Sequence, residues 1–241
     1  MTNKRLLCIC PSRSRADALE EMLCSFVNTR SAGTDLLVYL NDDDPKLSEY
    51  DFLKNCSPIL DSHFIVGPKQ YITKTYNDFS ASGEYDYYSS CNDDHFFVTP
   101  EWDRKLIEIV ETKGKGWGCA MAADKLTDWT KHPHPSGCVV SGKLIKTLGY
   151  MFYPELHHIG NDVLLGKLLK DIGILFEAPE ILIEHRHWSN GYRPMDANYK
   201  WVYGPEEQNY GEAAMKKYIF EQYEIDKKKI LDAMGAEKCA T

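Results

Sequence analysis

The stretch YDYYSSCNDDHFFVTP, residues 85–100, places a cluster of polar side chains inside a segment that otherwise favours a β-strand. Residues of high strand propensity flank the cluster: Tyr85, Tyr87, Tyr88, Phe96, Phe97 and Val98. The cluster itself is Asn92-Asp93-Asp94-His95, and its two carboxylates are costly to bury without a positive partner. A divalent cation that carries a phosphorylated substrate would supply that charge. The alternative is a polar turn whose Asp residues cap the next helix.

The composition is that of an ordinary globular protein. The chain has 241 residues, of which 43% are hydrophobic and 27% charged, and this length suits one domain or one domain with an appended tail. No apolar run approaches the roughly 18 residues of a membrane span, and the first residues lack the apolar core of a signal peptide. We therefore expect a cytoplasmic protein.

Charge and cysteine content argue against two classes of site, although a local basic groove stays open. The net charge of −8 argues against a general nucleic-acid binder, which needs a basic surface. None of the eight cysteines forms a CxxC pair and most lie in apolar runs, so we expect reduced core residues and no cysteine-based zinc site.

The first half of the chain alternates strands with helices. Strands are predicted at Arg5–Cys10 (ended by Pro11), Leu36–Leu40, His63–Val66 and Tyr85–Cys91. A helix is predicted to open at Ser14, with Asp17 completing a variant capping box, and a second one spans Glu101–Lys113 after the cap Thr99-Pro100. This alternation predicts an α/β fold with a doubly wound, mostly parallel sheet and helices on both faces.

Three of these predicted strands end in polar clusters. The clusters are Pro11–Arg15, Asn41–Asp44 and Asn92–His95. Because ligands bind beyond the carboxyl ends of the strands in doubly wound sheets, the three clusters predict one common site.

The second half is less regular. We expect an irregular region over Gly116–Gly137, followed by helices at Ser141–Gly149 and Asn161–Lys170. Strands are predicted at Ile174–Phe176 and Ile181–Glu184. A mobile loop over Ser189–Gly204 should lead to an amphipathic tail helix over Glu206–Met234, bent around Gly211.

In this order of motifs the chain resembles the GT-A glycosyltransferases, most nearly the family 2 type that uses nucleotide sugars. The similarity covers about residues 4 to 188 and rests on the succession of motifs. It implies a GT-A-like catalytic domain over 1–188, with a nucleotide-sugar half at 1–115 and an acceptor half at 116–188. Residues 189–241 then form the mobile loop and the helical C-terminal tail.

The resemblance implies a nucleotide site at the first two strand ends. Pro11, Ser12, Arg13 and Arg15 stand where the family places its base and diphosphate, and Asp42, Asp43 and Asp44 where it contacts the base. Charge-assisted hydrogen bonds from the arginines suit a diphosphate. The alternatives are a solvated basic turn and an acidic strand stop.

The resemblance also implies a metal site for Mn²⁺ or Mg²⁺. Asn92-Asp93-Asp94 replaces the family's DxD-like motif, so either Asp93 or Asp94 holds the metal, and Asn92 and Asp93 are candidates to contact the nucleotide ribose. In EILIEHRHW the family's late strand supplies a metal-binding histidine, here His185. His187 alternates with it and is expected on the opposite face. A structural histidine is the alternative.

Asp162 stands where the family carries its catalytic acid, before an apolar helix. It would act as the general base for the acceptor hydroxyl, which predicts inversion at the anomeric carbon. The family's second acidic residue is replaced by Asn161, and the alternative for Asp162 is a helix cap. Aromatic and basic residues beyond this point suit a lid: Trp188, Tyr192, Arg193, Lys200, Trp201 and Tyr203.

We therefore expect a metal-dependent, inverting glycosyltransferase of the hexosyltransferase type with a UDP-type sugar donor. The acceptor stays open between a saccharide, a protein, a lipid-linked sugar and a modified nucleobase. One alternative is a sugar-phosphate nucleotidyltransferase, although the loop PSRSR lacks the glycines typical of that class. The other is a non-catalytic protein that binds nucleotide sugars or carbohydrates.

Overall fold

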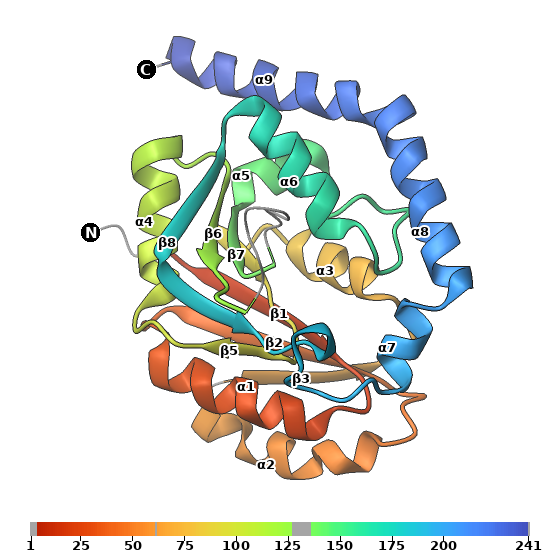
Figure 1. Cartoon of the computed structure of the whole chain (residues 1–241). Coiled ribbons are helices and arrows are strands. Elements are labelled where there is room, and N and C mark those ends of the chain that lie inside the picture. The colour runs from red at the N-terminus through yellow and green to blue at the C-terminus, as the bar shows by residue number, and fades with distance from the viewer. Residues whose placement is uncertain (1–3, 61, 127–135, 241) are drawn as a thin grey trace.

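The computed structural model describes residues 4–60, 62–126 and 136–240, and these form a mixed α/β structure around one curled sheet (Figure 1). The sheet has eight strands in the order β3-β2-β1-β4-β7-β6-β8-β5. The strands are β1 Leu6–Ser12, β2 Thr34–Asn41, β3 Ser62–Gly67, β4 Tyr87–Ser90, β5 His95–Phe97, β6 Cys119–Ala123, β7 Cys138–Ser141 and β8 Leu175–His185. β3, β2, β1 and β4 are parallel, as are β6 and β8, whereas β7 and β5 run antiparallel to their neighbours. The predicted fold class is confirmed.

The helices lie on both faces of the sheet (Figure 1). They are α1 Ala16–Thr29, α2 Asp51–Leu60, α3 Ile72–Ser80, α4 Trp102–Gly114, α5 Gly142–Leu148, α6 Asn161–Ile172, α7 Ala197–Val202, α8 Pro205–Lys217 and α9 Tyr223–Ala240. Short 3-10 turns occur at Leu47–Tyr50 and Trp188–Asn190, and a π-helical turn at Tyr218–Gln222 joins α8 to α9.

Successive residues of a strand point to opposite sides of the sheet, and the central strands are apolar at both sets of positions. Both faces of the sheet are therefore buried under helices. In β1, Leu6 and Cys8 face a core shared with α1 and α4, where Phe26 and Trp102 pack. Ile9 faces the other core, built with α3, α5, α6 and α9. The apolar runs of the sequence therefore indicated fully buried strands.

β1 continues through Pro11 to Ser12, so the prediction that Pro11 ends this strand was wrong. The carbonyl of Ile9 accepts a hydrogen bond from the amide of Cys91, which places the backbone groups of every second residue toward β4. The β4 ladder ends at the pair Ile9–Ser90. Pro11 therefore lies beyond that ladder, where its missing N–H is not needed, while pairing with β2 continues.

The predicted start of the first helix at Ser14 was also wrong. α1 begins at Ala16, and Arg15 precedes it without a side-chain cap. Ser14 adopts a φ of 56° and gives both its amide and its hydroxyl to Asp44. Ser14 therefore joins the ends of β1 and β2 to each other.

Four strands, β5, β6, β7 and β8, differ from the predictions. Residues 174–184, predicted as two strands, belong to one continuous strand, β8, which starts one residue later, at Leu175. β6 lies inside the region predicted to be loose, because Cys119–Ala123 is a run of small apolar residues without β-branched side chains. β5 and β7 gain their pairing only from distant partners, β8 for the first and β4 with β6 for the second. Trp129 and most of the HPHPSG segment lie outside the described residues.

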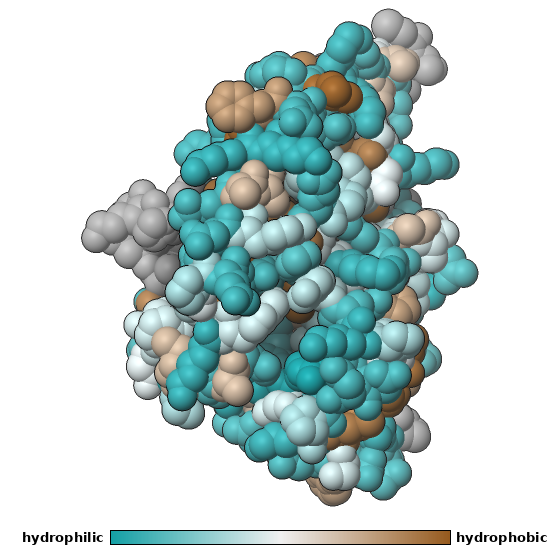
Figure 2. All heavy atoms as spheres, turned by 90° about the vertical axis from the view of Figure 1, so that its right-hand side faces the viewer, coloured by the Kyte–Doolittle hydropathy of each residue, from teal (hydrophilic) through white to brown (hydrophobic). Residues whose placement is uncertain are grey.

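The C-terminal tail bends at the π-helical turn Tyr218–Gln222 and not at Gly211. Gly211 instead packs against the α6 side, where an added Cβ would lie 3.1 Å from that of Ile159. Tyr218, Tyr223 and Ile230 are buried in the core beside α5 and α6. The outer face of the molecule seen in Figure 2 is mostly hydrophilic.

Five of the six cysteines whose side chains are described are buried, as expected: Cys8, Cys10, Cys91, Cys119 and Cys138. Cys24 is exposed on α1, which corrects the prediction for that residue. No helix of the described residues has the length and apolar character that crossing a membrane requires.

Candidate active site

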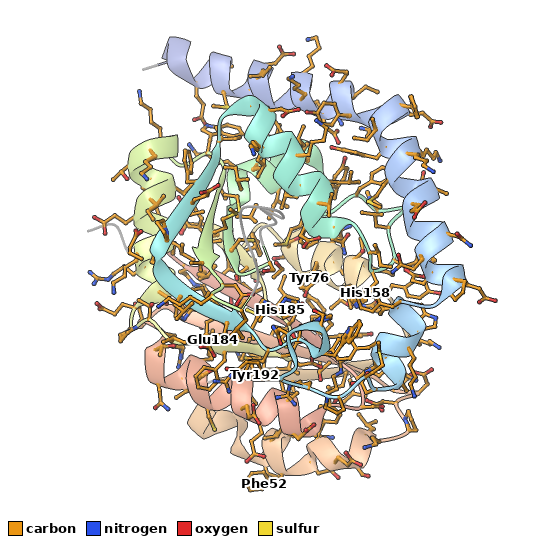
Figure 3. All side chains as sticks on the ribbon, viewed as in Figure 1. Phe52, Tyr76, His158, Glu184, His185 and Tyr192 are labelled. Carbon is orange, nitrogen blue, oxygen red and sulfur yellow. The ribbon has the colours of Figure 1, made fainter. Side chains whose placement is uncertain are left out.

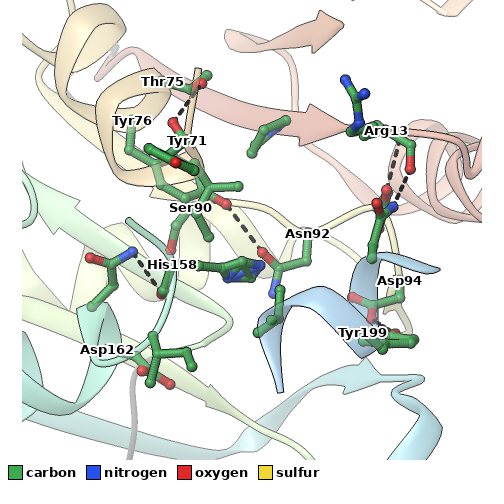
Figure 4. Close-up of a pocket in the computed structure, with 18 of the residues that line it drawn as sticks. Arg13, Tyr71, Thr75, Tyr76, Ser90, Asn92, Asp94, His158, Asp162 and Tyr199 are labelled. Atoms are coloured by element: carbon green, nitrogen blue, oxygen red, sulfur yellow. Dashed lines mark hydrogen bonds between the residues drawn. The ribbon is translucent and has the colours of Figure 1, made fainter. Parts of the chain in front are cut away.

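A cavity of about 510 Å³ lies beyond the carboxyl ends of β1 and β4, a volume typical of sites for small molecules. Its walls come from both halves of the sheet and from the tail (Figure 4). The predicted site residues that line it are Pro11, Ser12, Arg13, Arg15, Asn92, Asp93, Asp94, Asp162 and His185. Figure 3 shows Tyr76, His158 and His185 in the interior between the sheet and the C-terminal helices.

Asp93 is buried, and both of its carboxylate oxygens have partners. Oδ2 accepts a 2.7 Å hydrogen bond from the hydroxyl of Ser12, and Oδ1 lies 3.3 Å from Nη1 of Arg15. Burial raises the pKa of Asp93 to about 6, with Arg15 opposing the rise and the charge of Asp94 adding to it. The site thus holds two neighbouring carboxylates in unlike environments.

Asp94 is also buried, but only one of its oxygens is hydrogen-bonded. Oδ2 accepts a 2.6 Å hydrogen bond from Tyr199, and Oδ1 lies 3.1 Å from Nε2 of His185. Neither Oδ1 of Asp94 nor Nε2 of His185 has a well-directed hydrogen bond, so this contact is an ion pair. Burial would raise the pKa of Asp94, but the charge of His185 outweighs it and the pKa lies well below its usual range.

Histidines surround this ion pair. Burial lowers and Asp94 raises the pKa of His185, and the net direction is upward. The ring of His95 lies 5.1 Å from that of His185, and burial together with the charge of His185 lowers the pKa of His95 to about 3. His95 therefore stays neutral, and its buried Nε2 has no hydrogen-bond partner in the described part of the chain.

His187 lines the same cavity as His185, so the prediction that it points to the opposite face was wrong. β8 ends at His185, and the amide of His187 bonds back to the carbonyl of His185 in a turn. The alternation of side chains holds only within a strand, and here the strand has ended.

Arg15 connects the first strand end to the C-terminal tail. Its guanidinium binds Asp196 through Nε at 2.6 Å and Nη2 at 3.0 Å, in addition to its contact with Asp93. It also lies over the ring of Tyr199, 3.8 Å from the ring centroid. Two carboxylates and a π-face thus surround the Arg15 guanidinium. These partners offset the free-energy cost of burying its charge.

Arg13 and the acidic run after β2 form a second group. Arg13 donates to the carboxylate of Asp43 and, at 3.2 Å, to its backbone carbonyl. Asp44 is buried and accepts from Ser14 and from the amide of Lys46. Asp42 is exposed. Among the described residues, this acidic run does not line the cavity, and the residue of this strand end that does is Asn41.

Asp162 lies in the first turn of α6 and lines the cavity beside His158. The position before the helix is Gly160, with a φ of 92°, so the helix has no side-chain cap there. Oδ1 of Asp162 accepts a 2.9 Å hydrogen bond from the amide of Val163. Asn161 is occupied elsewhere, in hydrogen bonds with Thr73. The single carboxylate at this position faces the cavity.

Sequence reasoning missed several residues of the site. The amide of Gln70 donates to the side chain of Asn41 beyond the ends of β3 and β2, and from the tail Tyr199 donates to Asp94 while Asp196 accepts from Arg15. The aromatic content of the segment after Trp188 indicated a lid, and Trp201 and Tyr203 of that prediction do line the cavity. No local pattern distinguished Tyr199 from the other tyrosines there.

The donor atoms at the end of β4 suit a hard divalent cation. Oδ1 of Asp94 and Nε2 of His185 are buried and, apart from their mutual ion pair, have no well-directed hydrogen-bond partner. A carboxylate oxygen and an imidazole nitrogen together are a donor set that Mn²⁺ accepts. Within the described residues no group of three or more such side chains is already arranged as a metal site.

The comparisons with known proteins support the fold. No family model matches the sequence, and no curated protein matches it. Among solved structures, a mannosyltransferase from Pyrobaculum calidifontis, in complex with GDP-mannose and Mn²⁺, aligns with a TM-score of 0.63 at 12% identity over 99% of this chain and 81% of that chain.

Two further structures align in the same way. TarS residues 1–349 from S. aureus, in complex with UDP, gives a TM-score of 0.59 at 12% identity over 74% of this chain and 59% of that one. Glucosyl-3-phosphoglycerate synthase from Mycobacterium tuberculosis, with Mg²⁺ and UDP, gives 0.58 at 12% identity over 88% of this chain and 78% of that one. The chain thus has the fold of GT-A-type glycosyltransferases, as the sequence predicted.

Proposed function

We propose that this protein is a glycosyltransferase that moves a sugar from a nucleoside-diphosphate donor of the UDP type to an acceptor hydroxyl, with Mn²⁺ or Mg²⁺. The observation that carries the proposal is the buried pair Asp93 and Asp94 at the end of β4, with His185 3.1 Å from Asp94. Two adjacent carboxylates are buried at the place where ligands of such sheets bind. The three similar structures, which are complexes with a nucleoside diphosphate or its sugar, support the same interpretation.

Asp94 and His185 would hold the metal ion, with Asp93 beside it. When bound, the metal stabilises the negative charge that develops on the leaving nucleoside diphosphate, an effect worth several kcal/mol. The two oxygens of Asp93 hold Ser12 and Arg15. Because each carboxylate oxygen can accept a second hydrogen bond, Asp93 would also contact the ribose, together with Asn92.

The nucleotide would lie along the ends of β1 and β2. Pro11, Ser12 and Arg13 line this part of the cavity, and Arg13 carries a cation that can reach a phosphate. Asn41 and Gln70 offer amide groups to the base at the place where the acidic run was expected. In this proposal the nucleotide contacts come from the nucleotide-sugar half at 1–115, and Asp162, the candidate base, lies in the acceptor half at 116–188.

Asp162 is our candidate for the general base, with the acceptor hydroxyl as its proton source. It lines the cavity from α6, and the metal-binding candidates line it from the segment after β4 and from the end of β8. A base on the acceptor side predicts that the acceptor attacks from the face opposite the leaving group, so the configuration of the sugar inverts.

Thermal stability in the presence of nucleotides tests this proposal. The full chain is heated with UDP, GDP, ADP and their sugars, with and without Mn²⁺, and a ligand at a hundredfold excess over its Kd stabilises by about 2.7 kcal/mol. We expect a shift with one nucleotide that depends on Mn²⁺ and is lost in Asp94→Asn. Asp78→Asn, a surface carboxylate of α3, serves as the matched control.

Turnover then distinguishes the proposal from its alternatives. Incubation with the stabilising nucleotide sugar and Mn²⁺ should release the nucleoside diphosphate. Pyrophosphate release from a nucleoside triphosphate and a sugar phosphate would instead show a nucleotidyltransferase. Binding without any transfer or hydrolysis would show a binding protein, and no shift with any nucleotide would contradict the proposal as a whole.

A further inference from the structure

Four aromatic rings are stacked beside the mouth of the cavity. His157 lies between Tyr71 and Tyr210, with ring centroids 3.8 Å from each and interplanar angles of 18° and 9°. The indole of Trp201 is parallel to Tyr71 within 5°, at a centroid distance of 5.7 Å. These separations are those of stacked rings, so the orientation of Trp201 is supported by the rings behind it.

Contacts between distant segments hold this stack in place. The amide of Thr73 bonds to the carbonyl of His157, and the hydroxyl of Tyr210 donates to the carbonyl of Glu155 at 2.8 Å. Nδ1 of His157 lies 3.3 Å from a carboxylate oxygen of Glu207. Residues before α3, before α6 and on α8 therefore support the tail helix α7, which carries Trp201. A rigidly held ring loses little entropy when a ligand binds to it.

The cavity side of this arrangement is open. Tyr71, Trp201 and Tyr203 line the cavity and are 41%, 45% and 47% exposed. We name these three residues the aromatic wall. Scattered apolar side chains on a surface need no explanation, but three half-exposed aromatic rings lining one cavity mark a place where a ligand covers apolar area.

The aromatic wall adjoins Asp162. The ring of His158, which also lines the cavity, lies 6.4 Å from that of Trp201. The hydroxyl of Tyr203 lies 3.4 Å from Nε2 of His187, and after burial the charge of Asp162 is the largest influence that raises the pKa of Tyr203. Hydrogen-bonding groups and flat apolar rings thus meet at one end of the cavity.

We propose that the aromatic wall is the acceptor subsite and that the acceptor is a saccharide, whose sugar ring lies against the indole of Trp201. A sugar ring presents a flat face of C–H groups and an edge of hydroxyls. The π-face of an aromatic ring attracts the partly positive C–H groups, and Asp162, His158 and Tyr203 offer partners for the hydroxyls. This inference rests on the proposed transferase function and assigns the substrate class that it leaves open.

Two other ligands, a lipid chain and a nucleobase, are alternatives for the aromatic wall. A lipid chain would bury the carboxylate of Asp162 and the ring nitrogens of His158 against hydrocarbon, which is unfavourable. A nucleobase can also stack on Trp201, and in that case the wall would bind the donor and not the acceptor. The experiment below separates these two ligands.

The test measures saccharide binding to the full chain by isothermal titration calorimetry. The probes are cellobiose, lactose, mannobiose and chitobiose, each added in the presence of Mn²⁺ and the nucleoside diphosphate identified by thermal stability. We expect at least one disaccharide to bind, and Trp201→Ala to weaken its binding at least about tenfold, a typical effect of removing a stacked aromatic ring. Binding of the nucleotide should change less than twofold.

Variants control for folding and for general effects on the surface. Trp201→Phe retains an aromatic face and should keep most of the saccharide affinity, whereas Trp201→Leu keeps apolar volume without a π-face and should lose it. Phe52→Ala removes a side chain that is 65% exposed and points outward from α2 (Figure 3), and it should have no effect. If Trp201→Ala unfolds, the comparison of the Phe and Leu variants carries the test.

Two results would overturn the inference, and each is distinguishable from failure of the proposed function. If the nucleotide binds and no disaccharide does, the acceptor assignment is wrong while the transferase proposal stands. If Trp201→Ala weakens the nucleotide and leaves the disaccharide unchanged, the aromatic wall is a base platform of the donor. If neither ligand binds, the proposed function itself fails.

Discussion

The hydroxyl of Tyr199, on helix α7 of the C-terminal tail, donates a 2.6 Å hydrogen bond to Oδ2 of Asp94, 105 residues earlier in the chain. The same tail segment places Asp196 on Arg15, which in turn contacts Asp93. The predicted mobile loop is therefore part of the carboxylate cluster. The two carboxylates of the β4 end are held by partners from opposite ends of the sequence.

The hydrogen bond from Tyr199 should contribute to stability. Tyr199→Phe leaves Oδ2 of a buried carboxylate without its donor, so we expect the free energy of unfolding to fall by about 1.5–3 kcal/mol. Urea denaturation of the metal-free protein measures this. Tyr210→Phe removes an exposed tyrosine hydrogen bond and should cost less than half as much. Equal losses of unfolding free energy in the two variants would show that the hydrogen bond to Asp94 contributes no more than an exposed one.

Asp93 and Asp94 should differ in their effect on metal binding. Asp94 has an oxygen without a directed hydrogen bond, whereas both oxygens of Asp93 are engaged. Asp94→Asn should therefore abolish the thermal shift that Mn²⁺ adds to nucleotide, and Asp93→Asn should reduce it. Both variants should lower turnover by at least about a hundredfold, because each weakens stabilisation of the leaving group. An unchanged Mn²⁺ shift in Asp94→Asn would exclude Asp94 as the ligand.

Substitution of Asp162 should slow the chemical step without changing the affinity for the donor nucleotide. Asp162→Asn removes the base but keeps the shape, so we expect kcat to fall by about 10²–10⁴ while nucleotide affinity is unchanged. Proton NMR of the wild-type product should show an inverted anomeric configuration. A product of retained configuration, or a variant with full kcat, would be incompatible with Asp162 as the base.

His158 should make stability depend on pH. Burial, with the nearby charge of Arg15, lowers the pKa of His158 from 6.5 to about 4. The folded protein thus favours the neutral ring, and this stabilisation is complete above pH 6.5 and declines as the pH falls toward 4. Between pH 7 and pH 4.5, wild type should lose about 2–3 kcal/mol more than His158→Gln. Urea denaturation at both values checks this, and His63→Gln, an exposed histidine of β3, should behave like wild type.

Asp103 should be important for folding outside the site. Its buried carboxylate accepts from the amide and hydroxyl of Ser31, at 2.8 and 2.9 Å, and from the hydroxyl of Thr34. Asp103→Ala leaves three donors without an acceptor, and we expect a loss of about 3 kcal/mol or more in unfolding free energy. Glu108→Ala, at an exposed position of the same helix, is the matched control and should stay within about 0.5 kcal/mol of wild type.

Most of the fold could be predicted from local patterns. The strand at residues 34–41, the helix that begins after Ser141 and the helix that ends before Gly173 are all encoded by apolar spacing and by capping residues close in sequence. In the helix after Ser141, for example, the serine hydroxyl accepts from the amide of Leu144, as a cap does. The antiparallel strands β5 and β7 were missed because their pairing partners lie far away along the chain.

The candidate site divides in the same way. Local sequence predicts that carboxylates and arginines follow buried strands, because strand propensity and polar strand ends are properties of neighbouring residues. Which of them meet depends on the folded chain: Arg15 binds Asp93 and Asp196, His187 lines the cavity beyond the end of β8, and Tyr199 donates to Asp94. These contacts join segments up to 181 residues apart. Packing brings these groups together and removes them from water, so each buried charge needs a partner within the fold, and no local pattern encodes that partner.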